Sequence, residues 1–114
     1  MCFKRLKSLE ALFLSSCNVT GCIPEWICEL TNLRQLDMQQ NQLCGIIPYD
    51  IDKLQNLLYL NCKDNNGLGG TLPVEQLSRL SKLNRLSIVN TDILTSPSLL
   101  RALQQNLPRC KVWN

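Results

Sequence analysis

Residues 33–48, with the sequence LRQLDMQQNQLCGIIP, place apolar side chains at regular intervals that recur along the rest of the chain. The first leucine of this segment has counterparts at intervals of 24, 24, 26 and 24 residues, which gives the series Leu9, Leu33, Leu57, Leu83 and Leu107. A period of this size indicates that similar units stack side by side, each packing only on its neighbours. A single unit buries too few aliphatic side chains to offset the conformational entropy lost on folding. The 114 residues are therefore expected to form one domain, 1–114.

Two further apolar positions in each unit predict a short strand with one buried face. The first of these positions holds Leu12, Leu36, Leu60, Leu86 and Cys110. The second, two residues later, holds Leu14, Met38, Cys62, Ile88 and Val112. A spacing of two residues is the period of a strand that buries every other side chain. About five short parallel strands are therefore expected.

A polar position follows each of the first four strands, where the chain must turn. It is occupied by Cys17, Asn41, Asn65 and Thr91. An asparagine amide can both donate to and accept from backbone groups left open at such a turn. Thr91 is expected to do this less well, because a hydroxyl offers fewer hydrogen bonds.

The repeated positions also predict the boundaries of the units. The four repeats are residues 9–32, 33–56, 57–82 and 83–106, preceded by an incomplete half-repeat, 1–8, and followed by a terminal strand at about 109–113. Ser96-Pro97 is typical of the start of a helix, and Pro108 would end that helix. A helix and a strand are thus expected to cap the C-terminal end.

The G-x-I-P sequence at the end of residues 33–48 makes the chain resemble the plant-type leucine-rich repeat proteins. The resemblance covers residues 3–93. It implies an α/β fold, a short right-handed solenoid with a parallel β-sheet on the concave face and loops or short helical segments on the convex face. It also implies recognition of a protein or peptide by the concave face.

Side chains between the buried positions of the strands should point out of the concave sheet. The residues expected to bind a partner are Phe13, Gln35, Asp37, Gln39, Tyr59, Asn61, Lys63, Arg85 and Ser87. Exposed aromatic residues and Arg are favoured interface anchors, although a short solenoid can also expose a few aromatics without consequence. In this register Lys111 lies beside Ser87. Trp113 is expected to cover the core rather than to contact a partner.

Composition argues against several other functions. The chain contains no histidine, so histidine-dependent nucleophiles and histidine metal sites are excluded, and neither an enzymatic activity nor a cofactor is expected. The net charge of +3 is spread along the chain, which does not indicate nucleic-acid binding. No apolar run approaches the length of a membrane span, so no membrane insertion is expected.

The seven cysteines include no C-x-x-C pair, and no two occupy the same repeat position in adjacent units. Cys22 and Cys44 fall in separate connecting loops. These features favour reduced, mostly buried thiols and a cytoplasmic or otherwise intracellular location. The start of the chain also lacks the apolar run of a signal peptide, and secreted members of the resembled family carry paired cysteines before their first repeat.

Three functional hypotheses remain. The preferred one is an intracellular, non-catalytic interaction module that binds a protein or peptide through its concave sheet. The second is a structural subunit or fragment of a larger assembly, which would associate edge to edge through an uncapped N-terminal edge at residues 3–14. The third is an extracellular recognition domain of the receptor type.

Overall fold

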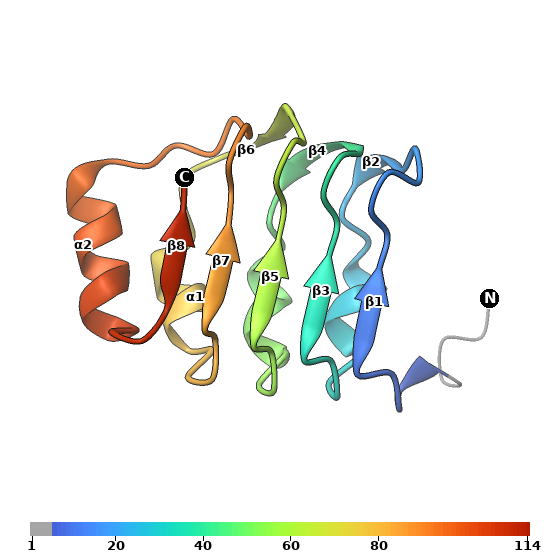
Figure 1. Cartoon of the computed structure of the whole chain (residues 1–114), viewed down its shortest axis with the longest axis horizontal. Helices are drawn as coiled ribbons and strands as arrows, with labels where there is room; N and C mark the ends of the chain where they lie inside the picture. The colour runs from blue at the N-terminus through green and yellow to red at the C-terminus, as the bar shows by residue number, and fades with distance from the viewer. Residues whose placement is uncertain (1–5) are drawn as a thin grey trace.

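A parallel five-stranded sheet runs along one side of the molecule in a computed structural model that describes residues 6–114 (Figure 1). Its strands, in spatial order, are β1 (Ala11–Phe13), β3 (Gln35–Asp37), β5 (Tyr59–Asn61), β7 (Arg85–Ser87) and β8 (Lys111–Trp113). This is the concave sheet of a leucine-rich-repeat solenoid, as the sequence predicts. Residues 1–5, including part of the expected half-repeat and the start of the expected N-terminal edge, lie outside the described residues.

The first four strands keep the register of the sequence repeat. Leu12 lies opposite Leu36, and Leu36 lies opposite Leu60, which in turn lies opposite Leu86. The buried leucines of adjacent repeats therefore stack directly on one another, as the spacing predicts.

The last strand departs from that register by two residues. Lys111 lies opposite Arg85, and Trp113 lies opposite Ser87, so the expected placement of Lys111 beside Ser87 is wrong. The reason is that Leu107 caps the C-terminus of a helix and does not occupy the position that Leu83 holds before β7. The interval from β7 to β8 is therefore longer than the leucine spacing suggests.

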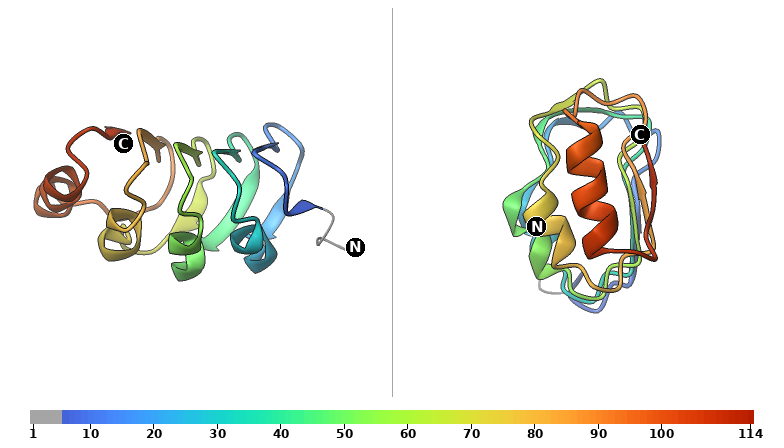
Figure 2. Two further views of the ribbon diagram at one scale, coloured as in Figure 1. Left: turned by 90° about the horizontal axis from the view of Figure 1, so that it is seen from below. Right: turned by 90° about the vertical axis from the view of Figure 1, so that its left-hand side faces the viewer.

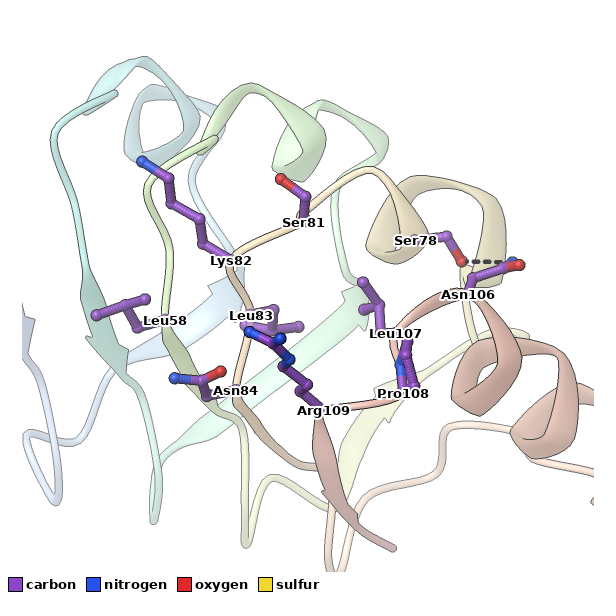
Figure 3. A pocket seen from close by; sticks show the side chains of 10 residues that line it. All are labelled: Leu58, Ser78, Ser81, Lys82, Leu83, Asn84, Asn106, Leu107, Pro108 and Arg109. Carbon is purple, nitrogen blue, oxygen red and sulfur yellow. Dashed lines mark hydrogen bonds between the residues drawn. The ribbon is translucent and has the colours of Figure 1, made fainter.

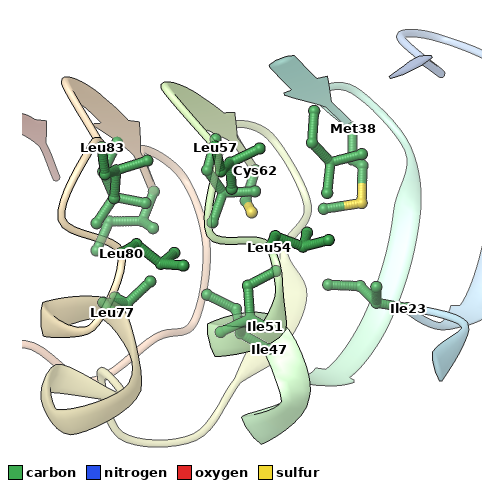
Figure 4. Close-up of a cluster of buried hydrophobic side chains, with 14 of the residues drawn as sticks. Ile23, Met38, Ile47, Ile51, Leu54, Leu57, Cys62, Leu77, Leu80 and Leu83 are labelled. Atoms are coloured by element: carbon green, nitrogen blue, oxygen red, sulfur yellow. The ribbon is translucent and has the colours of Figure 1, made fainter. Parts of the chain in front are cut away.

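The core lies between this sheet and the convex segments. It is formed by aliphatic side chains from every repeat, many of them completely buried; Figure 4 shows part of it, including Leu54, Leu57, Leu77, Leu80 and Leu83. The first repeat is less well covered than the others, because its core residues Leu9, Leu12 and Leu14 are only half-buried.

The convex face carries one short helical segment in each of the first three repeats (Figure 2). These segments are the 3₁₀-helices η2 (Glu25–Glu29) and η3 (Tyr49–Lys53) and the α-helix α1 (Val74–Ser78). A proline precedes each segment at its N-cap. The third repeat is longer than its predecessors, which gives the chain room for the wider turn of an α-helix.

A second parallel sheet joins the two faces and was not predicted. Its strands are β2 (Thr20–Cys22), β4 (Gln42–Ile46) and β6 (Gly67–Gly69). In this sheet Cys22 lies directly opposite Cys44. The sequence repeat instead equates Cys22 with Ile46, so the strands are staggered by two residues relative to the repeat. No two cysteines share a repeat position, which indicated that none would stack between adjacent repeats; this interpretation is wrong for Cys22 and Cys44.

The C-terminal cap has the predicted form. Helix α2 (Pro97–Asn106) starts after Ser96, whose hydroxyl oxygen accepts a hydrogen bond of 3.2 Å from the backbone N–H of Leu99. Leu103 and Leu107 are buried against the core. The helix thereby covers the end of the solenoid before the chain returns to form β8 (Figures 1 and 2).

The asparagine turn positions make the hydrogen bonds expected of them. The Asn41 side chain accepts from the backbone N–H groups of Cys17 and Val19 at 3.0 Å each, and donates to the carbonyl oxygen of Leu14 at 2.7 Å. Thr91 makes only a 2.7 Å bond to the Ile88 carbonyl and a longer one from the N–H of Ile93. The two asparagines therefore tie adjacent repeats together, and Thr91 does so less well.

Candidate protein-binding surface

Seven of the nine residues predicted to bind a partner lie on the strands of the five-stranded sheet. One row across it, in spatial order, is Ala11, Gln35, Tyr59, Arg85 and Lys111. A second row is Phe13, Asp37, Asn61, Ser87 and Trp113. Gln39 and Lys63 follow the ends of β3 and β5. Residues far apart in the sequence thus form one continuous surface, which we call the concave face.

The three residues at the centre of the second row were expected to be exposed to solvent, but they are buried. Asp37 and Ser87 are each only 8% exposed and Asn61 is 4% exposed. The two Asp37 carboxylate oxygens accept hydrogen bonds from the backbone N–H and the side-chain amide of Gln39, at 3.1 and 3.2 Å. Asn61 accepts similarly from the backbone N–H of Lys63 at 3.0 Å. The short side chains of Asp37 and Asn61 thus satisfy the chain where it leaves the strand, and these hydrogen bonds hold them against the sheet.

A hollow on the C-terminal half of the concave face gathers most of the predicted residues. It is lined by Gln39, Tyr59, Asn61, Lys63, Arg85, Ser87 and Trp113. Six of these seven were predicted from the sequence. The remaining three predicted residues, Phe13, Gln35 and Asp37, lie outside this hollow, although Gln35 lines a neighbouring one together with Tyr59 and Arg85.

Trp113 is the residue of this hollow that the sequence reasoning missed. Its side chain is 45% exposed on the concave face, so the expectation that it covers the core is wrong. The error follows from the register of the last strand, because Trp113 lies beside Ser87 and not two residues further along. The sequence predicts that the helix ends before Pro108, but Leu107 also fits the leucine spacing, so the 24-residue register was carried on to β8.

The exposed charges of this half of the concave face are cationic. Lys63, Arg85 and Lys111 are all exposed, and none of them forms an ion pair with another described residue. The pKa of the Tyr59 phenol is raised, first by burial and then by the nearby Asp37 carboxylate. Tyr59 therefore remains a neutral hydrogen-bond donor at physiological pH.

Another hollow lies near the N-terminal ends of β5, β7 and β8, where the turn before β7 meets the end of α2 (Figure 3). It is lined by Leu58, Ser78, Ser81, Lys82, Leu83, Asn84, Asn106, Leu107, Pro108 and Arg109. Its polar groups are already engaged in part: Asn106 donates to the Ser78 hydroxyl at 3.0 Å and Lys82 donates to Asn56 at 2.8 Å. The lining contains no carboxylate or thiol that could act as a base or nucleophile.

The described thiols fall into two groups. Cys28, Cys62 and Cys110 are buried, and desolvation raises their pKa values to about 11, 12 and 11. Cys17, Cys22 and Cys44 are exposed, so the prediction of mostly buried thiols is wrong for these three.

Residues 6–114 contain no cluster of three or more metal-ligating side chains that could hold a metal ion. None of the helices in this part of the chain is long and apolar enough to cross a membrane.

Comparisons with known proteins agree with the fold. Residues 1–43 match the family model described as "Leucine rich repeat". Receptor-like protein 35 of Arabidopsis thaliana is 41% identical over 81 residues, which cover 70% of this chain and 8% of the relative. The chain spans about a tenth of the length of the curated relatives it matches.

Solved structures show the same similarity. The plant peptide hormone receptor RGFR1, in complex with RGF2, superimposes with a TM-score of 0.83 and 33% identity over 96% of this chain and 17% of the receptor. The leucine-rich-repeat ectodomain of the receptor kinase SOBIR1 from Arabidopsis thaliana gives a TM-score of 0.77 and 27% identity, covering 98% of this chain and 59% of the ectodomain. These comparisons lend no support to a cytoplasmic location. Together with the repeat register and the parallel concave sheet, they show that the chain is a leucine-rich repeat protein of the plant type.

Proposed function

We propose that this chain is a non-catalytic recognition unit that binds a protein or peptide through the concave face. The observation that carries the proposal is the hollow in which Tyr59, Arg85 and Trp113 come together from three adjacent strands. Aromatic residues and Arg are the side chains most enriched among the energetic anchors of protein interfaces. The fold itself does not need them there, since they point away from the leucine core.

The chemistry of the hollow suits an extended polypeptide. The two rings offer apolar surface, the Tyr59 hydroxyl donates a hydrogen bond, and Lys63 and Arg85 offer cations that no described acid neutralises. A segment with an apolar side chain next to an acidic one would engage both kinds of group. The concave face is also open, so a chain lying across the strands can reach several rows at once.

The similar proteins support this proposal and favour an extracellular location. RGFR1 is a plant peptide hormone receptor whose structure contains RGF2, and the SOBIR1 structure is that of an ectodomain. By analogy, the chain would be a segment of the extracellular recognition domain of a receptor. This replaces the intracellular location that the cysteine pattern favoured.

Affinity capture with paired variants tests the proposal. The wild-type chain, with its partners identified by mass spectrometry, is compared with the triple variant Tyr59→Ala, Arg85→Glu, Trp113→Ala. A control variant, Tyr49→Ala, Leu94→Ala, Arg101→Glu, changes similarly exposed residues away from the concave face. We expect a specific partner to be lost with the first variant and kept with the control, both being folded by circular dichroism. Loss with the control alone would refute the assignment.

A second function, association through the N-terminal edge, rests on a different observation. Leu9, Leu12 and Leu14 are half-buried, whereas their counterparts Leu33, Leu36 and Met38 are at most 2% exposed. Among the described residues, β1 pairs with β3 on one side and with no strand on the other. We propose that a further repeat or a partner strand covers this edge.

Backbone hydrogen bonding provides the test of this second function. The N–H of Leu14 donates to Asp37 on β3, so by strand alternation the N–H of Ala11 faces the open edge. Ala11→Pro removes that donor without touching the paired side. If the edge mediates association, sedimentation velocity should show concentration-dependent self-association of the wild-type chain that the variant lacks. A wild-type chain that stays monomeric at all concentrations would rule out edge-to-edge pairing between copies.

A further inference from the structure

The second sheet brings two exposed cysteines from different repeats next to each other. Cys22 ends β2 and Cys44 lies in β4, and the two are direct partners in the parallel ladder. Adjacent strands are about 4.8 Å apart. This separation falls inside the range of about 4.4–6.8 Å over which the Cα atoms of two cysteines can be joined by a disulfide. The backbone therefore already holds the two residues at bonding separation.

The Cys22 side chain lies against the neighbouring strand. Its Sγ atom lies 3.0 Å from the position that a Cβ atom would take on Gly45, the residue after Cys44. The Cys22 thiol thus lies beside Gly45 of β4, and rotation of this side chain toward Cys44 would close the disulfide. Gly45 has a φ of +75°, where glycine is favoured, and its lack of a side chain leaves this space to the sulfur atom.

The other described cysteines are less suited than Cys22 and Cys44 to form a disulfide. The buried Cys28, Cys62 and Cys110 are shielded from solvent, and burial raises the pKa of each, which keeps them protonated and unreactive. Cys17 is exposed, but the residue that accepts a hydrogen bond from its backbone N–H in the next repeat is Asn41, which offers no thiol. Among the described cysteines, only Cys22 and Cys44 are both exposed and paired across strands.

We propose that Cys22 and Cys44 form an oxidisable dithiol, which a small-molecule disulfide such as oxidised glutathione converts into a disulfide joining the first and second repeats. The thiolate of one cysteine attacks a sulfur atom of oxidised glutathione, breaks its S–S bond and releases one glutathione thiolate. The second cysteine thiolate then attacks the protein sulfur of the mixed disulfide and displaces the other glutathione. The two protein thiols lose two protons and two electrons, and the reagent becomes two reduced glutathione molecules.

The location of this link gives it a structural consequence. It would fasten the first repeat, in which Leu9, Leu12 and Leu14 are only half-buried, to the fully packed second repeat. A cross-link closing a loop of this length should raise the unfolding temperature of the oxidised chain by on the order of 10 °C. The proposal is independent of the concave face, because the second sheet lies on a different side of the molecule (Figure 1).

Peptide mapping in glutathione buffers tests the proposal. The purified chain is reduced, equilibrated at increasing ratios of oxidised to reduced glutathione, blocked with an alkylating reagent and digested with trypsin without reduction. Trypsin releases Cys44 in the peptide 35–53, which contains no other cysteine, and Cys22 in the peptide 8–34, which also contains Cys17 and Cys28. We expect these two peptides to become linked, with a loss of two hydrogen atoms in mass.

Single serine variants identify the sulfur atoms involved. The link and the rise in unfolding temperature should disappear in Cys22→Ser and in Cys44→Ser, and both should remain in Cys17→Ser. Circular dichroism establishes that each variant is folded. Alkylation of both Cys22 and Cys44 in the most oxidising buffer would overturn the proposal, as would a stable mixed disulfide with glutathione on each. A link from 35–53 that persists in Cys22→Ser would overturn it as well.

Discussion

The side-chain amide of Asn65 donates a hydrogen bond of 2.9 Å to the backbone carbonyl of Met38, in the preceding repeat. The same side chain also donates to the Cys62 carbonyl at 2.9 Å and accepts from the backbone N–H of Leu43 at 3.2 Å. Asn65 is completely buried. A single residue thus satisfies backbone groups of two repeats in a place that water does not reach.

Removing this side chain should destabilise the solenoid substantially. We expect Asn65→Ala to lower the free energy of unfolding by about 3 kcal/mol, because several buried backbone groups lose their partners together. Thr91→Ala, at the equivalent position of the next repeat, should lower it by only about 1 kcal/mol, since Thr91 is half-buried and makes fewer bonds. Urea denaturation of the two variants measures the difference, and equal losses would contradict this role for Asn65.

The stacked leucines should contribute unequally along the solenoid. Leu60 is completely buried between neighbouring repeats, whereas its counterpart Leu12, at the N-terminal edge, is half-buried. We expect Leu60→Ala to cost about 3–4 kcal/mol of unfolding free energy and Leu12→Ala less than half of that. Chemical denaturation of the isolated chain checks both values. A Leu12→Ala variant as unstable as Leu60→Ala would mean that the first repeat is covered in solution.

Glycines that share one backbone conformation should differ in their tolerance of a side chain. Gly21 and Gly70 both have positive φ, at +81° and +76°. A Cβ atom on Gly21 would meet nothing within 4 Å, but on Gly70 it would lie 2.7 Å from Cγ2 of Ile46. Gly21→Ala should therefore cost about 1 kcal/mol, from backbone strain alone, and Gly70→Ala roughly 2–3 kcal/mol. Thermal unfolding of both variants checks this order, which the reverse ranking would contradict.

The buried Cys62 thiol should make the reduced protein less stable at alkaline pH. Burial raises its pKa from the ordinary 9.0 to about 12, so the folded state retains a proton that the unfolded chain releases. The stability that this proton contributes is fully present below pH 9 and is lost as the pH rises from about 9 to 12. Over this interval we expect the unfolding free energy of Cys62→Ala to fall less steeply than that of the wild type. Parallel pH profiles for the two proteins would argue against the buried thiol as the cause.

The periodic part of the fold was readable from the sequence. Stacked leucines at the strand positions, such as Leu36, predict β1, β3, β5 and β7 because only one register buries all of them. Ser96 and Pro97 likewise predict the start of α2, since capping depends on local sequence. These elements follow from patterns that each repeat carries within itself.

Features that depend on the register between adjacent repeats could not be predicted from the sequence. The second sheet has few aliphatic positions to mark its register, so the sequence repeat gives no sign of the two-residue stagger that pairs Cys22 with Cys44. The helix before β8 shifts Trp113 onto the concave face for a similar reason. The burial of Asp37 is accompanied by hydrogen bonds from Gln39 to its carboxylate, which the repeat pattern does not indicate.

Hydroxyl-radical footprinting of the chain with its captured partner tests the proposed function most directly, because aromatic side chains on both faces report on contact. Tyr59 and Trp113 line the concave hollow, while Tyr49, 64% exposed, begins η3 on the convex side. We predict that the partner lowers the oxidation rates of Tyr59 and Trp113 several-fold and leaves that of Tyr49 unchanged. Protection of Tyr49 with unchanged rates at Tyr59 and Trp113 would contradict recognition by the concave face.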